Sequence, residues 1–350
     1  MARAAAIEGI DPGSWQATLL PLPKRFSRGV ATSFCGGHPV GSVEAARGPA
    51  GGCWWPDGEP ELLTLGGFKS VRAGTAGGDM VPGHWNKGAT GEMGAVLWRL
   101  TGGRLDAANL HVKGYESTWA TAAGGGSAVG VGTPQGKPGA RRPDVGLMWT
   151  GSGDPAVVTA EGKVLLLATD GTRLAGNVGG RAALWPTASA PPIDLAPERM
   201  FASEVRALTD TYQAGVAFKG MCARAALWRG TATSFSDLTP AGFQAAQIFG
   251  AAGPYQVGLV RRKDTTRNGS TGCDDRAVVW QESADRWFDL NDLLPPDTYN
   301  ASTAWAIEIR GQDVRVCGAA IRYEATHAGT KHESHAVPVS HPVLWTARLA

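Results

Sequence analysis

The segment Arg224-Ala-Ala-Leu-Trp228 is the clearest copy of a phrase that recurs along almost the whole chain. Related copies read Ala95-Val-Leu-Trp98, Gly146-Leu-Met-Trp149, Arg181-Ala-Ala-Leu-Trp185, Arg276-Ala-Val-Val-Trp280 and His341-Pro-Val-Leu-Trp345, and a degenerate first copy reads Gly52-Cys-Trp-Trp55. Successive tryptophans lie between 36 residues apart (Trp149 to Trp185) and 65 residues apart (Trp280 to Trp345). A repeat of about 40 to 50 residues is typical of the blades of a β-propeller.

Three further segments recur with the tryptophan phrase: an apolar pair, a strand of small residues that follows an aromatic residue, and a strand that ends in glycine. The glycines are Gly41, Gly83, Gly130, Gly176, Gly215, Gly258 and Gly318. Tight turns such as Gly36-Gly37 and Asp170-Gly171 join the second and third segments as hairpins. Four short strands in each of seven repeats predict an all-β fold, a seven-bladed β-propeller of four-stranded antiparallel blades around a central channel.

The two ends of the chain supply complementary parts of one repeat. The segment from Trp15 to Leu20 continues where the segment after Trp345 stops. We therefore expect adjacent termini to close the ring, with residues 1–14 as an N-terminal extension and residues 15–350 as a single propeller domain.

Composition narrows the class of protein. The 350 residues include 49 glycines and 22 prolines, which suits many short strands joined by turns, and 43% are hydrophobic, which is enough for a core. A net charge of +2 provides no bulk attraction to nucleic acid or to an anionic membrane. The five cysteines lack paired spacing and are predicted to be free thiols. No apolar run resembles a secretion signal or a membrane span, so the expected location is the cytoplasm.

The repeats resemble the bacterial propeller-like HAF repeat family, named after a His-Ala-Phe signature before Leu-Trp. The resemblance covers residues 15–349, although no copy reads His-Ala-Phe and His341 is the only histidine at that position. The resemblance implies a propeller-like fold and no agreed activity. It also implies an extracellular location, because such repeats are usually extracellular, and this differs from the cytoplasmic expectation above.

Four consecutive repeats place a basic or titratable residue at the start of the tryptophan phrase: Arg181, Arg224, Arg276 and His341. Symmetry places them in an arc on the face that also carries the long loops, including residues 134–143, 261–275 and 321–340. Paired guanidinium donors suit carboxylate or phosphate recognition, so this arc is the predicted ligand-binding site. The alternative is that each arginine pairs locally with an acid and holds neighbouring blades together.

Two other groups carry weaker signals. His327, His332 and His335 lie in one long loop and can supply ligands for zinc, or they are simply part of a solvated loop. The aromatic residues that precede the small-residue strands can ring a ligand pocket or form a packing ring; they are Phe26, Phe68, Tyr115, Phe201, Phe243 and Tyr299.

No recognisable catalytic motif or phosphate-binding glycine loop is in place, so no cofactor is predicted and catalytic residues stay unknown. The sequence therefore predicts a non-catalytic binding or scaffold propeller that presents its long-loop face to an unknown protein or to a small polar or anionic ligand. The alternative is an enzyme with a pocket at the channel mouth that acts on an anionic metabolite.

Overall fold

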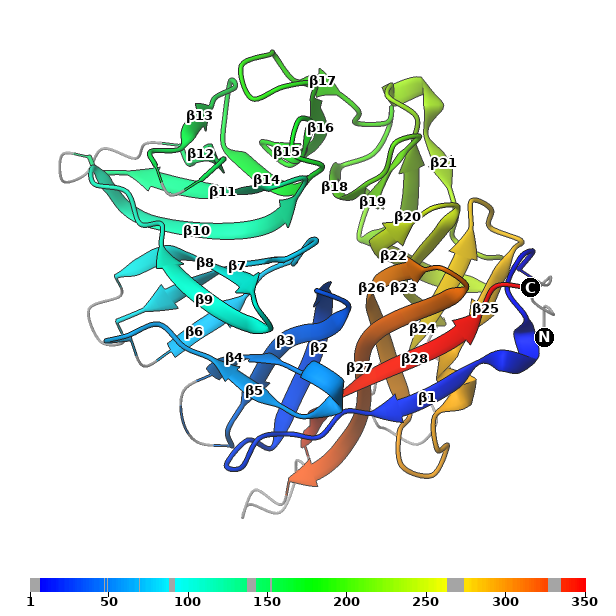
Figure 1. Cartoon of the computed structure of the whole chain (residues 1–350). Helices are drawn as coiled ribbons and strands as arrows, with labels where there is room; N and C mark the ends of the chain where they lie inside the picture. Colours follow the sequence, from blue (N-terminus) through cyan, green and yellow to red (C-terminus); the bar gives the residue numbers. More distant parts are fainter. Residues whose placement is uncertain are drawn as a thin grey trace.

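The computed structural model describes residues 7–46, 48, 50–68, 70–87, 92–136, 143–151, 153–262, 274–326 and 335–350. The fold is all-β and propeller-like, with antiparallel four-stranded blades arranged around a central opening (Figure 1). Helical structure in the described ranges is confined to four short 3₁₀ segments: η1 (Pro12–Ser14), η2 (Pro56–Gly58), η3 (Ala232–Ser234) and η4 (Leu290–Leu293). No helix among those residues is long and apolar enough to cross a membrane.

Five sheets each contain four strands. The first comprises β2 (Arg28–Cys35), β3 (His38–Glu44), β4 (Ala50–Trp54) and β5 (Glu61–Leu63). The second comprises β14 (Val164–Thr169), β15 (Leu174–Val178), β16 (Arg181–Trp185) and β17 (Ile193–Asp194). The third comprises β18 (Ala202–Leu208), β19 (Gln213–Lys219), β20 (Cys222–Trp228) and β21 (Ser236–Asp237). The fourth comprises β22 (Phe243–Ala252), β23 (Tyr255–Arg262), β24 (Asp275–Gln281) and β25 (Trp287–Asp289). The last comprises β26 (Ala301–Arg310), β27 (Asp313–Thr326), β28 (His335–Arg348) and β1 (Gln16–Leu19).

The sixth sheet has eight strands and differs from the prediction of seven separate blades. It contains β6 (Ser70–Ala73), β7 (Met80–Asn86), β8 (Met93–Thr101) and β9 (Arg104–Asn109), followed by β10 (Tyr115–Gly124), β11 (Ser127–Pro134), β12 (Val145–Trp149) and β13 (Ala156–Val158). The parallel pair Ser117–Met93 joins the two halves. The backbones of the two halves also come together where Thr75 N donates a hydrogen bond to Thr121 O at 2.8 Å. This contact requires glycine at position 74, because a Cβ there would lie only 2.5 Å from the Thr121 carbonyl oxygen.

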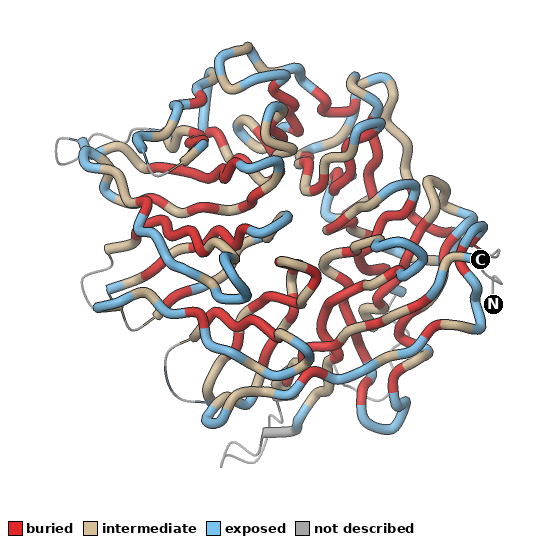
Figure 2. Tube along the Cα trace, in the orientation of Figure 1, coloured by how far each residue is buried: buried red, intermediate tan, exposed pale blue. Residues whose placement is uncertain are grey.

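Each sheet begins with a strand at the central opening and ends with a short strand at the rim. Side chains alternate across the sheets, as the buried-intermediate pattern of β14 illustrates. The repeat tryptophans are buried between neighbouring sheets; Trp228, for example, shares a core cluster with Leu195, which follows β17 of the preceding sheet, and with Val205 of its own sheet. Figure 2 shows that buried residues follow the strands, whereas exposed residues lie mainly at turns and at the rim.

Strands from both chain ends share the last sheet. β1 pairs with β28 from Gln16–Thr346 to Leu19–Val343, and the C-terminal Ala350 N donates to Gly9 O at 3.1 Å (Figure 1). The first and last sheets are also in contact, because the Cys317 thiol approaches Ser33 O at 3.6 Å. Ile7 and Ile10 are buried in the core of the last two sheets, so the described part of the N-terminal extension packs against the propeller.

One predicted loop is a strand pair. Residues 321–326 of β27 and 335–340 of β28 pair in antiparallel register from Ile321–Ser340 to Thr326–His335, and from Arg322 onward this pair extends beyond β26. Alternating apolar residues such as Val337 and Val339 support this extension, which the density of histidines in the segment had obscured. The described thiols of Cys35, Cys53, Cys222 and Cys317 are free.

Candidate functional site

The strands nearest the centre surround a cavity in two adjoining parts, of about 580 Å³ and about 290 Å³. All five four-stranded sheets and both halves of the eight-stranded sheet contribute residues to its wall. Both parts are lined by Thr75, Leu167, Arg206, Phe249 and Trp305. Volumes in this range are typical of small-molecule sites, which occupy about 300–1,000 Å³.

A β-bulge aims one side chain from each of six inner strands into this cavity. In each of these strands the pairing register shifts by one residue, so that one residue has no counterpart on the partner strand. The extra residues are Thr32, Thr121, Leu167, Arg206, Phe249 and Trp305, and all six line the cavity. Bulges redirect side chains and are common beside functional sites.

A glycine on the adjacent strand accommodates each bulge. It is the recurrent glycine of the third segment, and it lies within the strand rather than at the predicted strand end, as Gly258 does in β23. A Cβ on Gly258 would lie 1.8 Å from Gln247 O, and one on Gly215 would lie 2.1 Å from Glu204 O. The same clash, at 1.8 to 2.1 Å, arises at Gly41, Gly83, Gly130, Gly176 and Gly318. The repeated glycines are therefore required by the backbone geometry that builds the cavity wall.

Arg206 is the centre of a charged and polar group in the larger part of the cavity. Its Nε donates to Glu204 Oε1 at 2.6 Å, and its Nη1 donates to Gln247 Oε1 at 3.1 Å. Asn177 Nδ2 donates to the other Glu204 oxygen at 3.3 Å. The guanidinium charge is thus balanced by a carboxylate within the cavity.

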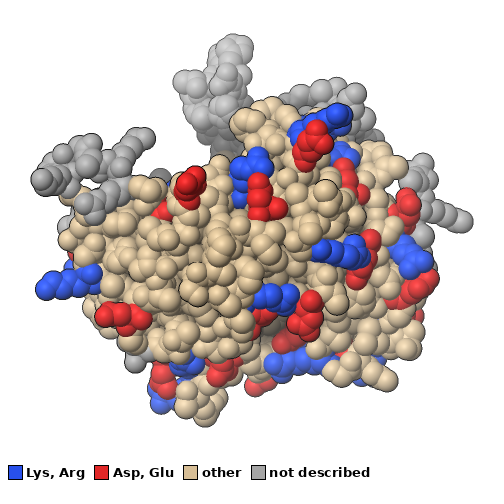
Figure 3. All heavy atoms as spheres, turned by 90° about the horizontal axis from the view of Figure 1, so that it is seen from above, with Lys and Arg blue, Asp and Glu red and all other residues tan. Residues whose placement is uncertain are grey.

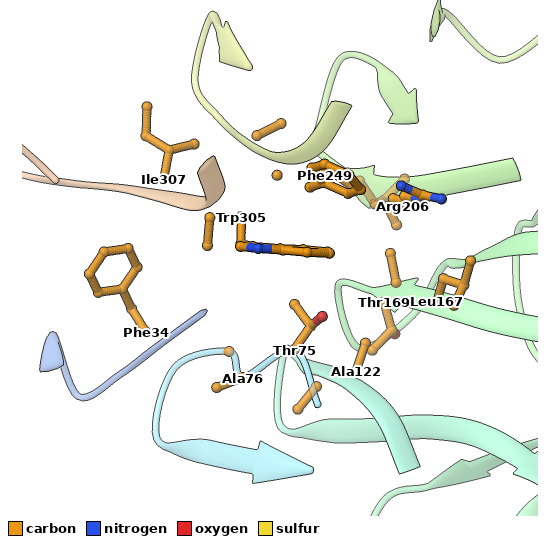
Figure 4. Close-up of a pocket in the computed structure, with 18 of the residues that line it drawn as sticks. Phe34, Thr75, Ala76, Ala122, Leu167, Thr169, Arg206, Phe249, Trp305 and Ile307 are labelled. Carbon is orange, nitrogen blue, oxygen red and sulfur yellow. The ribbon is translucent and has the colours of Figure 1, made fainter. Parts of the chain in front are cut away.

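An aromatic stack adjoins this group. The Arg206 guanidinium lies 4.7 Å from the centre of the Phe249 ring, and Phe249 lies 4.2 Å from Trp305 with an interplanar angle of 33°. Figure 4 shows the Trp305 ring edge-on, with Phe249 on one side and Thr75 and Ala122 across the open space on the other. Trp305 is therefore half-buried, with part of its surface facing the cavity.

Glu308 lines the smaller part. Its Oε1 accepts a hydrogen bond from Arg310 Nε at 3.0 Å, and its Oε2 lies 3.8 Å from Arg315 Nη1. Arg315 also donates to Gly37 O and lies over the Phe34 ring at 5.5 Å. Both charged groups of the cavity wall thus include their own counter-ions.

The arginines predicted as a ligand site lie at the rim, each paired with an aspartate of the neighbouring outer strand. Arg181 contacts Asp194 at 2.7 Å, Arg224 contacts Asp237 at 2.7 Å, and Arg276 contacts Asp289 at 2.5 Å and also Asp292. These contacts agree with the alternative of local pairing, although each pair joins two strands of one sheet rather than two blades. Figure 3 shows the same character over one side of the molecule, where basic and acidic side chains lie next to each other.

His341 occupies the equivalent position on β28 without an acidic partner on the outer strand. Its ring lies edge-on to Tyr299 at 5.7 Å, and its Nδ1 is buried without a hydrogen-bond partner among the described residues. Burial lowers the pKa of His341, and the nearby Arg322 lowers it further, so the imidazole favours its neutral form.

The proposed metal ligands are His327, His332 and His335. His327 and His332 lie outside the described residues, and His335 begins β28. No group of three or more potential metal ligands occurs within the described ranges. The aromatic residues at the starts of the inner strands lie away from the cavity lining; Phe68, for example, stacks on Trp85 at 4.2 Å, and Phe201 is 85% exposed.

Sequence reasoning missed the cavity residues, although a signal for them exists. In four repeats the bulged residue lies six positions after the aromatic residue that precedes the strand: Thr32 after Phe26, Thr121 after Tyr115, Phe249 after Phe243 and Trp305 after Tyr299. The chemistry at this position differs from repeat to repeat, in contrast to the constant glycines and tryptophans. That contrast was available in the sequence.

Comparison with known proteins finds solved structures of low sequence identity and no family. No protein-family model matches the chain, and no curated protein matches it either. Among solved structures, Sqt1 from Chaetomium thermophilum aligns with a TM-score of 0.48 and 10% identity, over 97% of this chain and 100% of that one. The tricorn protease aligns with a TM-score of 0.24 and 10% identity, over 97% of this chain and 40% of that one.

Proposed function

We propose that this protein is a non-catalytic binding module, a seven-bladed propeller whose central cavity holds a small polar ligand. One observation carries the proposal: six bulged side chains, from six different strands, converge on a single cavity. Such sites on rigid strands hold side chains more firmly than sites on loops.

The count of seven blades rests on interpreting the eight-stranded sheet as two blades. Each half contains four consecutive antiparallel strands, with its own glycine opposite the inner strand and its own buried tryptophan: Gly83 and Trp98 in one half, Gly130 and Trp149 in the other. With the other five sheets this makes seven, and the pairing of β1 with β28 supports closure of the ring by both termini.

Binding without catalysis is favoured by the state of the charged groups. Glu204 pairs with Arg206, and Glu308 pairs with Arg310 through Oε1 while its buried Oε2, which has no hydrogen-bond partner among the described residues, lies 3.8 Å from Arg315 Nη1; the adjacent cations favour the ionised form of both acids and weaken them as bases. A ligand at the rim arginines would first have to displace Asp194, Asp237 or Asp289, so the cavity is the better supported site. Four expectations from the sequence stay predictions: that the long-loop face binds a partner, that the ligand is anionic, that the protein is cytoplasmic, and that the repeats are related to the HAF family.

A blocked cavity tests this function. Leu167 is half-buried and lines both parts, so Leu167→Trp should fill the space while the outer surface stays unchanged. We expect at least one probe from a panel of sugars, nucleosides and amino acids to raise the melting temperature of the wild type and to have no such effect on the variant. Val157→Trp, at a side chain that is 50% exposed on the outer strand β13, is the matched control and should respond like the wild type. Equal responses in all three proteins would overturn the proposal.

A further inference from the structure

The larger part of the cavity combines an apolar plate with polar groups distributed around it. Trp305 and Phe249 form the plate. The polar groups come from strands of different sheets and include Thr32, Thr121, Glu204 and Gln247. A ligand that fits must therefore have one apolar face and polar groups around most of its perimeter.

We propose that the larger part of the cavity binds a neutral saccharide, with the C–H face of a pyranose ring against Trp305 and its hydroxyl groups on the surrounding polar side chains. The inference deepens the proposed function and rests on it. A pyranose has the required division of surface, because its axial C–H groups form an apolar face and its hydroxyl groups point outward from the ring edge.

Unused hydrogen-bonding capacity supports this class. The Gln247 amide nitrogen, the Trp305 indole nitrogen and the Thr75 hydroxyl donate a hydrogen bond to no other residue that the structure describes, so each can donate to a ligand oxygen. The Thr121 hydroxyl donates to Leu166 O at 2.6 Å, which leaves its oxygen as an acceptor. Glu204 provides a further acceptor. Hydroxyl groups donate and accept at the same atom, so they match a mixed set of this kind.

The charge balance argues against an anionic ligand at this place. The Glu204 carboxylate lies against the Arg206 guanidinium at 2.5 Å, and no uncompensated cation remains in the lining of the larger part. A carboxylate or phosphate would have to compete with Glu204 for Arg206, and burying it without a partner is unfavourable. A neutral ligand avoids both costs.

A nucleoside is the nearest competing ligand, since its base can also stack on Trp305. The hydrogen-bonding groups of a base lie on one or two edges of its plane. The polar groups here come instead from β2, β10, β18 and β22, on several sides of the cavity. The distribution therefore favours the saccharide.

Isothermal titration calorimetry on the full chain tests the inference. The probes are the neutral disaccharides maltose, cellobiose and lactose, with adenosine, uridine and glucuronate as comparators. We expect at least one disaccharide to bind, and we expect Trp305→Leu to weaken it about tenfold through loss of the stacking face. Gln247→Met should weaken it by a smaller factor. Phe201→Leu, which removes an aromatic ring that is 85% exposed outside the cavity, should leave the affinity unchanged.

The outcomes separate the two levels of the proposal. Binding of a nucleoside or of glucuronate but of no disaccharide, with loss of affinity in Trp305→Leu, would overturn the saccharide and leave the binding function intact. Disaccharide affinity that is the same in Trp305→Leu and Phe201→Leu would overturn the assigned site. Binding of none of the probes would overturn the inference, and with no response to the wider panel the proposed function would also fail.

Discussion

The inner strands and the tryptophan-bearing strands are made from the same repeat, yet they obey different rules. On the tryptophan strands the key residue is constant, and Trp98, Trp149, Trp185, Trp228 and others are buried between sheets. On the inner strands the bulged position contains threonine twice and then leucine, arginine, phenylalanine and tryptophan. Constancy marks the residues that every blade needs in order to pack.

Variation at the bulge has a different meaning. Each bulged residue contacts the cavity, and its backbone geometry is secured by the glycine on the next strand rather than by its own side chain. The side chain is therefore free to differ without a change of fold. Within a single repeat protein, the comparison of equivalent positions thus separates packing from recognition without any second sequence.

The largest expected difference is between two tryptophans of these two classes. Trp228→Ala should lower the free energy of unfolding by about 3–5 kcal/mol, because the ring is fully buried in a packed cluster. Trp305→Ala should lower it by only about 1 kcal/mol, since this ring is half-buried and its main described aromatic contact is Phe249. Urea denaturation of both variants measures the difference. Similar losses would show that Trp305 is also part of the core.

An effect at the lower end of the range expected for Trp228→Ala should separate two glycines. Gly258→Ala introduces a Cβ at 1.8 Å from Gln247 O, so we expect a loss of about 3 kcal/mol as the bulge is distorted. Gly151→Ala is the matched control, because no atom lies within 4 Å of its added Cβ. Thermal unfolding of the pair gives the measurement. If Gly258→Ala were as stable as Gly151→Ala, the glycine would not be what accommodates the bulge.

Much of the architecture was visible in the sequence, because a repeat amplifies whatever each blade requires. The four strands, the glycine step and the pairing of strands from both termini follow from residues that recur. The merging of two predicted blades into one sheet could not be predicted, since it depends on how closely two backbones approach: Met93 pairs with Ser117, and Gly74, without a side chain, lies against Thr121 O. The bulges could not be recognised from spacing. Because nearly every inner strand contains the extra residue, the spacing within one repeat matches that within the next and marks no insertion.

The rim arginines show that a signal can be present and yet be overlooked. Each lies 13 residues before its aspartate: Arg181 before Asp194, Arg224 before Asp237 and Arg276 before Asp289. The constant interval is that of two adjacent antiparallel strands with their connection. From the sequence, local pairing with an acid was left as the alternative to an anion site but no acid was identified by its spacing, whereas the constant interval to these aspartates indicates ion pairs.

The smallest expected effects come from these three arginine–aspartate ion pairs, which differ in how far they are exposed to solvent. The arginine side chains are 58%, 27% and 13% exposed at Arg181, Arg224 and Arg276. Arg276→Leu should cost about 2 kcal/mol because it leaves the largely buried Asp289 without its partner, whereas Arg181→Leu should cost less than about 1 kcal/mol because both members of that pair are solvated. Arg224→Leu should fall between them, and the cost at Arg181 should shrink further in high salt. Denaturation at two ionic strengths measures all three variants. A flat series, combined with a salt-sensitive anion that binds the wild type and not the variants, would instead favour the arc of arginines as a recognition surface.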